Sequence, residues 1–265
     1  MQCWSPKTER NARLQANNPP HTKHRAVILA GGQGRRLAPY TSVLPKPLMP
    51  IGNRAVLEIV VQQLALFGIT DITFCVGYLS HLIRAIFDSR TDRNVNISYV
   101  QEEIPLGTAA PVRLIEGLDD SFILMNGDVL TTLDYRDLLR RHRESGNVLT
   151  VATVQRTVKI DYGVVRVEDE VGRVHAWDEK PEIMSEVSMG IYAVEPQAID
   201  FIPKGEYFDF PDLVQALLAA EQPVGAYSYD GLWFDIGRRD DYEQAVASWT
   251  PTIPTGSYPN GGTES

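Results

Sequence analysis

The chain has 265 residues, 43% of them hydrophobic, and carries a net charge of −9 from 34 acidic and 25 basic side chains. This acidity argues against a surface for nucleic acids, and it means that an anionic ligand needs basic residues gathered at one place. No apolar run approaches the roughly eighteen residues of a membrane span, and with only Cys3 and Cys75 neither a disulfide framework nor a thiolate metal site is expected. The polar N-terminal stretch has no apolar core of signal-peptide length, so a cytoplasmic protein is predicted, with no membrane partner.

The two ends differ in composition from the middle of the chain. Residues 1–24 are polar and contain prolines, and residues 250–265 are rich in Pro, Gly, Ser and Thr, so both are predicted to be flexible tails. The folded part is expected to be a single domain over residues 25–249, with a first portion, 25–147, and a β-rich second portion, 148–249. The sequence contains no internal repeat.

The first portion alternates short apolar runs with helical patterns. Strands are predicted at 26–30, 72–76, 95–100 and 122–125, and helices at 56–67, 80–87, 108–116 and 134–144. Ser80 is expected to cap the second of these helices. Strands that alternate with helices in this way predict a doubly wound, mostly parallel α/β sheet of the Rossmann-like kind.

The second portion has shorter, more β-rich patterns. Strands are predicted at 148–154, 163–167, 174–177 and 187–194, with a turn at 168–172, and we expect them to extend or cover the same sheet. Helices at 211–220 and 240–248 flank a last short strand near Trp233. Ligands of an open α/β sheet bind at the carboxyl ends of its strands, so the loops after Ala30, Val100 and Met125 are the first places to look.

Three glycines stand directly after the first predicted strand, in the segment Leu29-Ala30-Gly31-Gly32-Gln33-Gly34-Arg35-Arg36-Leu37. Backbone N–H groups at glycines can approach a phosphate chain closely, and Arg35 and Arg36 add charge and paired donors. A plain tight turn is the alternative. The spacing excludes a P-loop, because no Lys-Ser or Lys-Thr follows, and a dinucleotide fingerprint, because Leu37 stands where Gly or Ala is needed.

A lysine between two prolines follows, in Pro45-Lys46-Pro47-Leu48. The prolines hold the backbone at Lys46 extended and aim its flexible cation. Together, Gly-Gly-x-Gly-x-Arg-Leu and Pro-Lys-Pro-Leu resemble the sugar nucleotidyltransferases, also called nucleoside-diphosphate-sugar pyrophosphorylases, and the resemblance covers roughly residues 26–247.

The resemblance implies a nucleotide site. Its residues are Leu29, Ala30, Gly31, Gly32, Gly34, Arg35, Arg36, Lys46, Gln101, Gly107, Thr108 and Asp128. In relatives the loop at 101–110 binds the base, and its Leu-Gly-Thr-Ala form here is most similar to mannose-1-phosphate guanylyltransferase-like members, whereas thymidylyltransferases usually show Leu-Ala-Gln-Ala. Ala110 departs from the family by replacing a common Gly, and Arg35 by replacing a frequent Thr.

A carboxylate, Asp128, ends the predicted strand at 122–125 after Asn126 and Gly127. Mg²⁺ takes oxygen ligands, typically one or two carboxylates together with substrate phosphates, although an aspartate at such a place is often a turn or cap residue. The resemblance implies that Asp235, in the Trp-x-Asp-x-Gly pattern, is the second metal ligand. Spacing alone does not show that pairing.

A sugar-phosphate site is also implied by the resemblance. Lys180, in Glu-Lys-Pro, is expected to contact the sugar phosphate, although a charged hairpin end is the plainer interpretation of that motif. The implied residues of this site are Asn126, Tyr162, Gly163, Glu179, Lys180, Ser188, Gly190 and Tyr192. Ser188 and Met189 replace the Asn-Ala or Thr-Gly that relatives carry, so a heptose or cyclitol phosphate is considered beside a mannose-1-phosphate-like sugar.

The implied reaction is an in-line attack by a sugar 1-phosphate oxygen on the α-phosphorus of a triphosphate, with Arg36, Lys46, Asp128 and Lys180 as catalytic residues and Mg²⁺ as cofactor. The first choice is GMP transfer from GTP; thymidylyl, uridylyl and adenylyl transfer to glucose 1-phosphate are alternatives. A non-catalytic nucleotide-sugar-binding subunit and a glycosyltransferase are the rivals. No C-terminal β-helix is expected, and homo-oligomerisation is left open.

Overall fold

The structure is a computed structural model that describes residues 24–89, 94–102, 104–168 and 172–250. The predicted tails lie outside these ranges except for His24 and Thr250, and so does most of the turn predicted at 168–172. Arg35 is described only in its backbone, which belongs to a short 3-10 turn. Among the helices of the described residues, none is long and apolar enough to cross a membrane.

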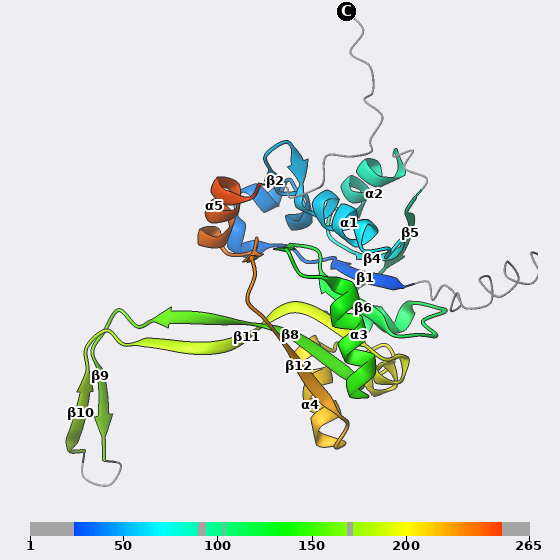
Figure 1. The fold of residues 1–265 in the computed structure, drawn as a ribbon. Helices are drawn as coiled ribbons and strands as arrows, with labels where there is room; N and C mark the ends of the chain where they lie inside the picture. Colours follow the sequence, from blue (N-terminus) through cyan, green and yellow to red (C-terminus); the bar gives the residue numbers. More distant parts are fainter. Residues whose placement is uncertain (1–23, 90–93, 103, 169–171, 251–265) are drawn as a thin grey trace, which may run out of the picture.

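A seven-stranded sheet forms the centre of the molecule (Figure 1), in the order β12-β8-β11-β6-β1-β4-β5. Its strands are β1 Arg25–Ala30, β4 Asp71–Val76, β5 Asn96–Gln101, β6 Phe122–Asn126, β8 Leu149–Lys159, β11 Glu182–Val194 and β12 Val224–Tyr229. Every neighbouring pair is parallel except the two that involve β11. This confirms the predicted mostly parallel sheet, and the chain order reverses between β1 and β6.

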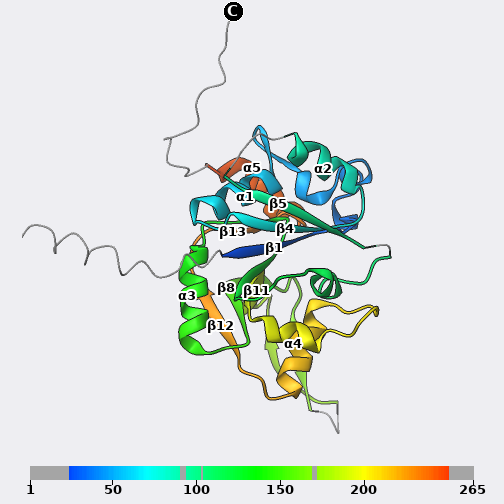
Figure 2. The same ribbon diagram turned by 90° about the vertical axis from the view of Figure 1, so that its right-hand side faces the viewer.

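Helices cover both faces of this sheet, as Figures 1 and 2 show. Side chains that alternate along the strands form two buried clusters; in β1, Ile28 belongs to one and Val27 to the other. The first cluster includes residues of α1 Val56–Leu66, α2 Ser80–Asp88, α3 Tyr135–Ser145 and α5 Arg239–Ser248, and the second includes residues of α4 Phe210–Ala219 and the 3-10 turns η4 Ala110–Leu114 and η5 Pro196–Phe201. The fold is therefore doubly wound, as the sequence predicts.

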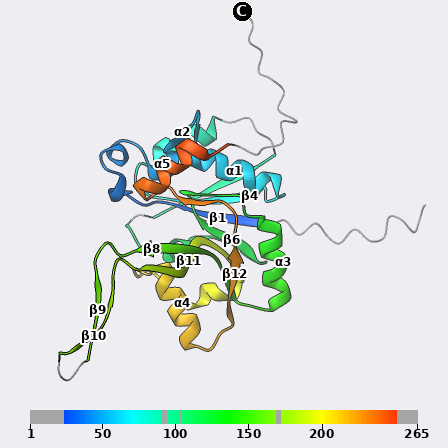
Figure 3. The same cartoon turned by 60° about the vertical axis from the view of Figure 1, so that its left-hand side comes forward.

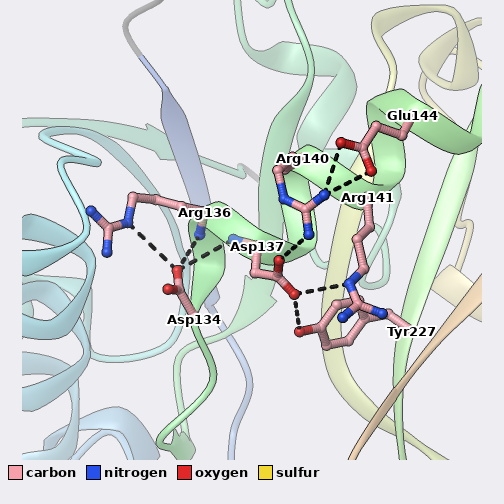
Figure 4. Close-up of polar contacts among 7 residues, drawn as sticks. All are labelled: Asp134, Arg136, Asp137, Arg140, Arg141, Glu144 and Tyr227. Carbon is pink, nitrogen blue, oxygen red and sulfur yellow. Dashed lines mark hydrogen bonds and ion pairs between the residues drawn. The ribbon is translucent and has the colours of Figure 1, made fainter.

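Helix α3 is tied to the edge strand β12 by a polar network (Figure 4). Asp134 caps the helix by accepting hydrogen bonds from the backbone N–H groups of its first turn. Asp137 accepts a hydrogen bond from the Tyr227 hydroxyl on β12 at 2.8 Å and pairs with Arg141 at 3.0 Å. Strand β12 was not predicted, because its sequence, Val-Gly-Ala-Tyr-Ser-Tyr, has no apolar run. The polar network with α3 helps to hold this strand at the edge of the sheet.

Two helix predictions need correction. Residues 108–116 form only η4, because Gly107 has a φ of +97° and Thr108 bonds to Asp209, so no helical turn begins before Ala110. Ser80 is the first residue of α2 rather than its cap. Leu79 takes the cap position with a left-handed backbone, and no side chain caps this helix.

The strands predicted in the second portion do not all join the sheet. Beyond the body of the protein, β8 and β11 continue as a two-stranded ribbon that carries a hairpin of β9 Val164–Val167 and β10 Val174–Asp178 (Figures 1 and 3). We call residues 155–187 the arm. The pair β9–β10 is a separate two-stranded sheet, so the expectation that it extends or covers the main sheet is wrong.

Candidate active site

A cavity of about 520 Å³ lies at the carboxyl ends of β1 and β6, where the chain order reverses. Such a reversal in an open α/β sheet leaves a crevice between the two outgoing loops, which is the usual place for a ligand. The residues of the predicted sites that line it are Leu29, Ala30, Gly31, Gly32, Gly34, Arg36, Lys46, Gly107, Thr108, Asn126, Asp128 and Asp235. The structure thus gathers most of the predicted nucleotide and metal residues around one cavity.

The glycine-rich loop is fixed by hydrogen bonds to its backbone carbonyls and is uncovered at Gly32. Gly34 has a φ of +61°, and a Cβ there would lie 2.9 Å from a methyl carbon of Thr41, so only glycine fits without strain. The Thr41 hydroxyl donates to the Gly34 carbonyl at 2.8 Å, and the N–H of Tyr78 donates to the Gly31 carbonyl at 3.2 Å. A Cβ on Gly32 would meet no atom within 4 Å. This leaves backbone at the cavity wall that a phosphate can approach.

Lys46 lies beside the glycine-rich loop, where a Cβ on Gly34 would be 3.0 Å from the Lys46 Cβ, and its side chain reaches between two carboxylates at the cavity wall. Lys46 begins the 3-10 turn η3 Lys46–Leu48, so the prediction of an extended backbone at Lys46 is wrong, and the preceding Pro45 is extended instead. The next two residues of the turn are buried, which fixes the backbone from which the side chain projects. Its Nζ makes a short ion pair with Asp128 and lies 3.7 Å from Oδ1 of Asp235. The side chain of Lys46 is only 16% exposed. A single cation is therefore shared by the two aspartates.

The two aspartates are brought together by a short antiparallel ladder. Strand β7 Val129–Thr131 directly follows Asp128, and it pairs with β13 Trp233–Asp235 so that Asp235 stands opposite Val129. The N–H of Ile236 also donates to the backbone carbonyl of Asp128 at 3.0 Å. Residues distant in sequence thus become neighbours through backbone pairing.

The donor set fits a divalent cation that takes part of its coordination from substrate. Asp128 and Asp235 supply hard oxygen ligands and already share a positive charge. Across the described part of the chain, no group of three His, Cys, Asp or Glu side chains could hold a metal ion. The pair therefore fits an ion such as Mg²⁺, which binds through one or two carboxylates and substrate phosphates, and does not form a complete protein cage.

The loop after β5 is clamped by a segment that sequence reasoning did not identify. Oδ1 of Asp209 accepts hydrogen bonds from the backbone N–H and the hydroxyl of Thr108, each at 2.9 Å. The N–H of Phe208 donates to the Leu106 carbonyl at 2.7 Å. Asp209 and Tyr207 also line the cavity. In sequence, an aspartate before α4 signals only the start of a helix; Asp209 does take the N-cap position, but its carboxylate bonds to Thr108 instead, and no local pattern reveals that contact.

Glu102 is another cavity residue that was not predicted. It follows β5, and its Oε1 accepts a hydrogen bond from the N–H of Leu106 at 3.0 Å. Burial raises the pKa of Glu102, against the effect of that hydrogen bond. Its neighbour Gln101, which was predicted to bind the nucleotide, is exposed and is not among the lining residues.

Three predicted sugar-phosphate residues lie behind Asn126 rather than in the cavity lining. Gly190 has a φ of +72° in the irregular part of β11, and a Cβ there would lie 2.6 Å from Nδ2 of Asn126. Ser188 donates to the Tyr192 hydroxyl at 3.2 Å. The Tyr192 ring is buried and stacks on Phe210, with ring centroids 3.6 Å apart. Of these residues, Gly190 is the one that lies against Asn126, from the adjacent strand.

The remaining predicted residues lie on the arm, outside the cavity lining. Tyr162 is 79% exposed, and Lys180 is exposed with a left-handed φ of 46°. Gly163 is covered by the Trp177 ring, whose Nε1 donates to Glu179 at 3.0 Å. Because β8 runs in the same direction as β6, the arm leaves the sheet at the edge that holds the cavity. The structure places these residues beyond the edge of the sheet that holds the cavity but does not bring them to the other predicted site residues.

Comparisons with known proteins agree with this arrangement. A family model described as nucleotidyl transferase matches residues 25–250. The chain is 34% identical over 242 residues to a UTP–glucose-1-phosphate uridylyltransferase of Synechocystis sp., covering 84% of this chain and 62% of that protein. It is 32% identical over 240 residues to mannose-1-phosphate guanyltransferase beta-B of Xenopus laevis, covering 86% and 65%. The chain thus spans less than two thirds of the length of these relatives.

A solved structure shows the same fold. HddC from Yersinia pseudotuberculosis, complexed with GMP-PN, superposes with a TM-score of 0.66 at 24% sequence identity, covering 84% of this chain and 98% of that one. At this identity the likeness concerns the fold alone. It includes the central sheet, whose carboxyl edge holds the cavity described above.

Proposed function

Because this chain belongs to the nucleotidyl transferase family, we propose that it transfers a nucleoside monophosphate from a nucleoside triphosphate to a sugar 1-phosphate and releases pyrophosphate. One observation carries this proposal: Lys46 lies between Asp128 and Asp235 at the wall of a cavity that the glycine-rich loop also lines. Backbone donors, cations and a pair of carboxylates suited to a divalent metal together serve a chain of phosphates. The glycine-rich loop, Lys46 with Arg36, and Asp128 with Asp235 support the proposal in these terms.

In the proposed reaction, an oxygen of the sugar 1-phosphate forms a bond to the α-phosphorus while the bond to the β-phosphate oxygen breaks. Pyrophosphate leaves with the bonding electron pair. No general base is required, because the attacking oxygen is already ionised. Since both reactants are anions, the protein contributes mainly positioning and charge neutralisation, and orientation alone can supply on the order of 7 kcal/mol.

Each residue has a distinct task in this scheme. Asp128 and Asp235 hold the divalent cation, for which we propose Mg²⁺; when bound it neutralises charge at the α-phosphate. Lys46 turns from the carboxylates toward the phosphates, and Arg36 contacts the pyrophosphate side. Lys180 on the arm places the sugar 1-phosphate. The glycine loop donates backbone N–H groups to the triphosphate.

GTP is the proposed nucleotide, and the acceptor is a mannose-1-phosphate-like sugar, with heptose and cyclitol phosphates as further candidates. Glu102 supports guanine, because a carboxylate in the cavity can accept hydrogen bonds from the adjacent N–H groups on the pairing edge of that base. The relatives named as guanylyltransferases support the same choice, whereas the uridylyltransferase keeps UTP open. Residues 25–249 act as one domain in this proposal, at work in the cytoplasm.

The decisive experiment is a matrix of nucleoside triphosphates against sugar 1-phosphates, with pyrophosphate release measured in the presence of Mg²⁺. We expect release with GTP and mannose 1-phosphate, and none after the metal is chelated. A chain that binds nucleotide sugars yet releases no pyrophosphate from any pair is a regulatory subunit. One that consumes a nucleotide sugar with a sugar acceptor is a glycosyltransferase. Either result contradicts the proposal.

A further inference from the structure

An ion pair between the buried Asp241 and the half-buried Arg156 lies directly behind Asp235. Asp241, in the first turn of α5, is 2% exposed, and its carboxylate is held by the guanidinium of Arg156 through two hydrogen bonds, one of them at 2.9 Å. Arg156 comes from β8, at the base of the arm, and its guanidinium lies 5.2 Å from the centroid of the Trp233 ring. A fully desolvated carboxylate needs such a counter-ion.

Asp241 also contacts the backbone of Asp235. Its Oδ2, the same atom that accepts from Arg156, accepts a hydrogen bond from the N–H of Asp235 at 3.1 Å. On the other side, Oδ1 of Asp235 accepts from the N–H of Gly237 at 2.8 Å. The backbone and the carboxylate of Asp235 are therefore each held by a separate partner, and one of these partners depends on Arg156.

The charge of Arg156 reaches Asp235 as well. The pKa of Arg156 is raised, first by its hydrogen bond with Asp241 and also by the nearby charges of Asp241, Asp235 and Asp240. The neighbouring ion pair on the same ribbon is different. Lys159 and Glu182 meet at 2.8 Å, but their side chains are 70% and 55% exposed, so that pair is solvated and does not reach the cavity.

We propose that Asp241 and Arg156 are positioning residues for the divalent-cation site: Asp241 fixes the direction of Asp235, and Arg156 holds Asp241 in place. The inference rests on the proposed role of Asp128 and Asp235 in holding a divalent cation. Hydrogen-bond partners of metal ligands commonly set metal affinity by tenfold to a hundredfold. Because Arg156 belongs to β8, the metal carboxylate is also linked to the strand that leads into the arm.

Direct binding of Mn²⁺ to the purified full chain, followed by electron paramagnetic resonance, tests this without catalysis. Asp128→Asn and Asp235→Asn should abolish the bound signal. Asp241→Asn and Arg156→Gln should weaken Mn²⁺ binding about tenfold or more, and Arg156→Lys should recover part of the loss by restoring a single donor. Asp240→Asn, which removes an exposed carboxylate next to Asp241, and Lys159→Gln should bind as the wild type does.

Mg²⁺ titrations of pyrophosphate release give a second readout. The Mg²⁺ concentration for half-maximal rate should rise about tenfold in Asp241→Asn and Arg156→Gln, while the rate at saturating Mg²⁺ falls less than about threefold. A purely structural role would instead lower the melting temperature and leave the Mn²⁺ affinity of the folded protein unchanged. Arg156→Lys retains a positive charge beside Asp241, so it is expected to fold. Its Mn²⁺ affinity can therefore be measured even if the other variants do not fold.

Wild-type Mn²⁺ affinity in folded Asp241→Asn, Arg156→Gln or Arg156→Lys would overturn the inference, and so would Mn²⁺ binding that does not depend on Asp128 and Asp235. The proposed function fails separately. If the wild type binds Mn²⁺ through Asp128 and Asp235 but releases no pyrophosphate from any substrate pair, the reaction is wrong and the positioning roles stand.

Discussion

At the scale of single residues, the site is organised by one shared cation. Lys46 neutralises both Asp128 and Asp235, which would otherwise repel each other at close range. A divalent cation can replace the ammonium group between the carboxylates, and this frees the lysine for the phosphates. The glycine-rich loop lines the same cavity. Under the proposed function, one cation would therefore replace another as substrate and metal enter.

Asp128→Ala removes one of the two carboxylates that are proposed to hold the metal. Pyrophosphate release should fall about a hundredfold or more, because a metal in such a site supplies several kcal/mol of charge stabilisation. Asp119→Ala, which changes an exposed acid before the other end of β6, is the matched control and should keep the wild-type rate. Turnover of Asp128→Ala at the wild-type rate would rule out the metal assignment.

Asp209→Ala removes the loop clamp, which comes from the N-cap position of α4. Loss of the hydrogen bonds to Thr108 should lower the free energy of unfolding by about 1 kcal/mol, measured by denaturant titration. It should also raise the KM for the triphosphate severalfold, because the loop at the cavity is no longer held. Asp212→Ala disturbs only the start of α4, since its carboxylate accepts from the N–H of Asp209. An equal rise in KM in both variants would contradict the clamp.

At the scale of elements, α3, β8 and the end of β11 meet at a buried histidine. The side chain of His142 is fully buried; its Nδ1 lies 2.8 Å from the Thr150 hydroxyl, and its Nε2 lies 3.1 Å from Glu195. Burial lowers the pKa of His142 from its ordinary value of 6.5, against the opposing effect of Glu195. The folded protein therefore holds this ring neutral at a pH where the unfolded chain binds a proton.

A pH-dependent loss of stability follows from this lowered pKa. As the pH falls below about 6.5, the unfolded state gains a proton that the folded state resists, so the contribution of His142 to stability declines until the folded pKa is passed. Urea unfolding at several pH values between 7.5 and 5.5 should show a steeper decline for the wild type than for His142→Gln. His175→Gln, on the exposed hairpin, should follow the wild type. Parallel curves for His142→Gln and the wild type would exclude this effect.

At the scale of the whole molecule, the body is stabilised by buried apolar clusters, and the arm is not. The buried clusters lie in the body, whereas the arm carries large exposed apolar side chains, among them Tyr162, Trp177 and Met184. A two-stranded hairpin such as β9–β10 is marginally stable alone. The body should therefore fold and bind nucleotide without the hairpin, whereas the acceptor depends on it.

Replacing residues 162–180 with a short Gly-Ser turn tests this division. The melting temperature and the affinity for a fluorescent GTP analogue should stay close to those of the wild type, because the hairpin pairs with no strand of the main sheet. The KM for the sugar 1-phosphate should rise by at least about tenfold, and Lys180→Ala should show part of that rise. Unchanged use of the acceptor by the shortened chain would remove the arm from the proposed site.

Much of the architecture follows from local pattern. Apolar runs of strand length, helical periodicity and the glycines after β1 predict the parallel sheet and its loops, because these features depend on residues close together in sequence. The predicted cavity residues Gly31, Gly34 and Lys46 come from the same kind of signal. Local pattern failed at η4 and at β12, where contacts with Asp209 and with α3 decide the outcome.

The sequence by itself therefore determined most of the sheet, the edge at which the cavity lies and many of the residues that line it. Only the tertiary structure decided that Lys46 lies between Asp128 and Asp235, that Asp209 holds Thr108, and that Arg156 supports Asp241 behind Asp235. The physical reason is the same in each case. These contacts join residues from distant parts of the chain, and their energies depend on burial and geometry that exist only after the sheet has formed.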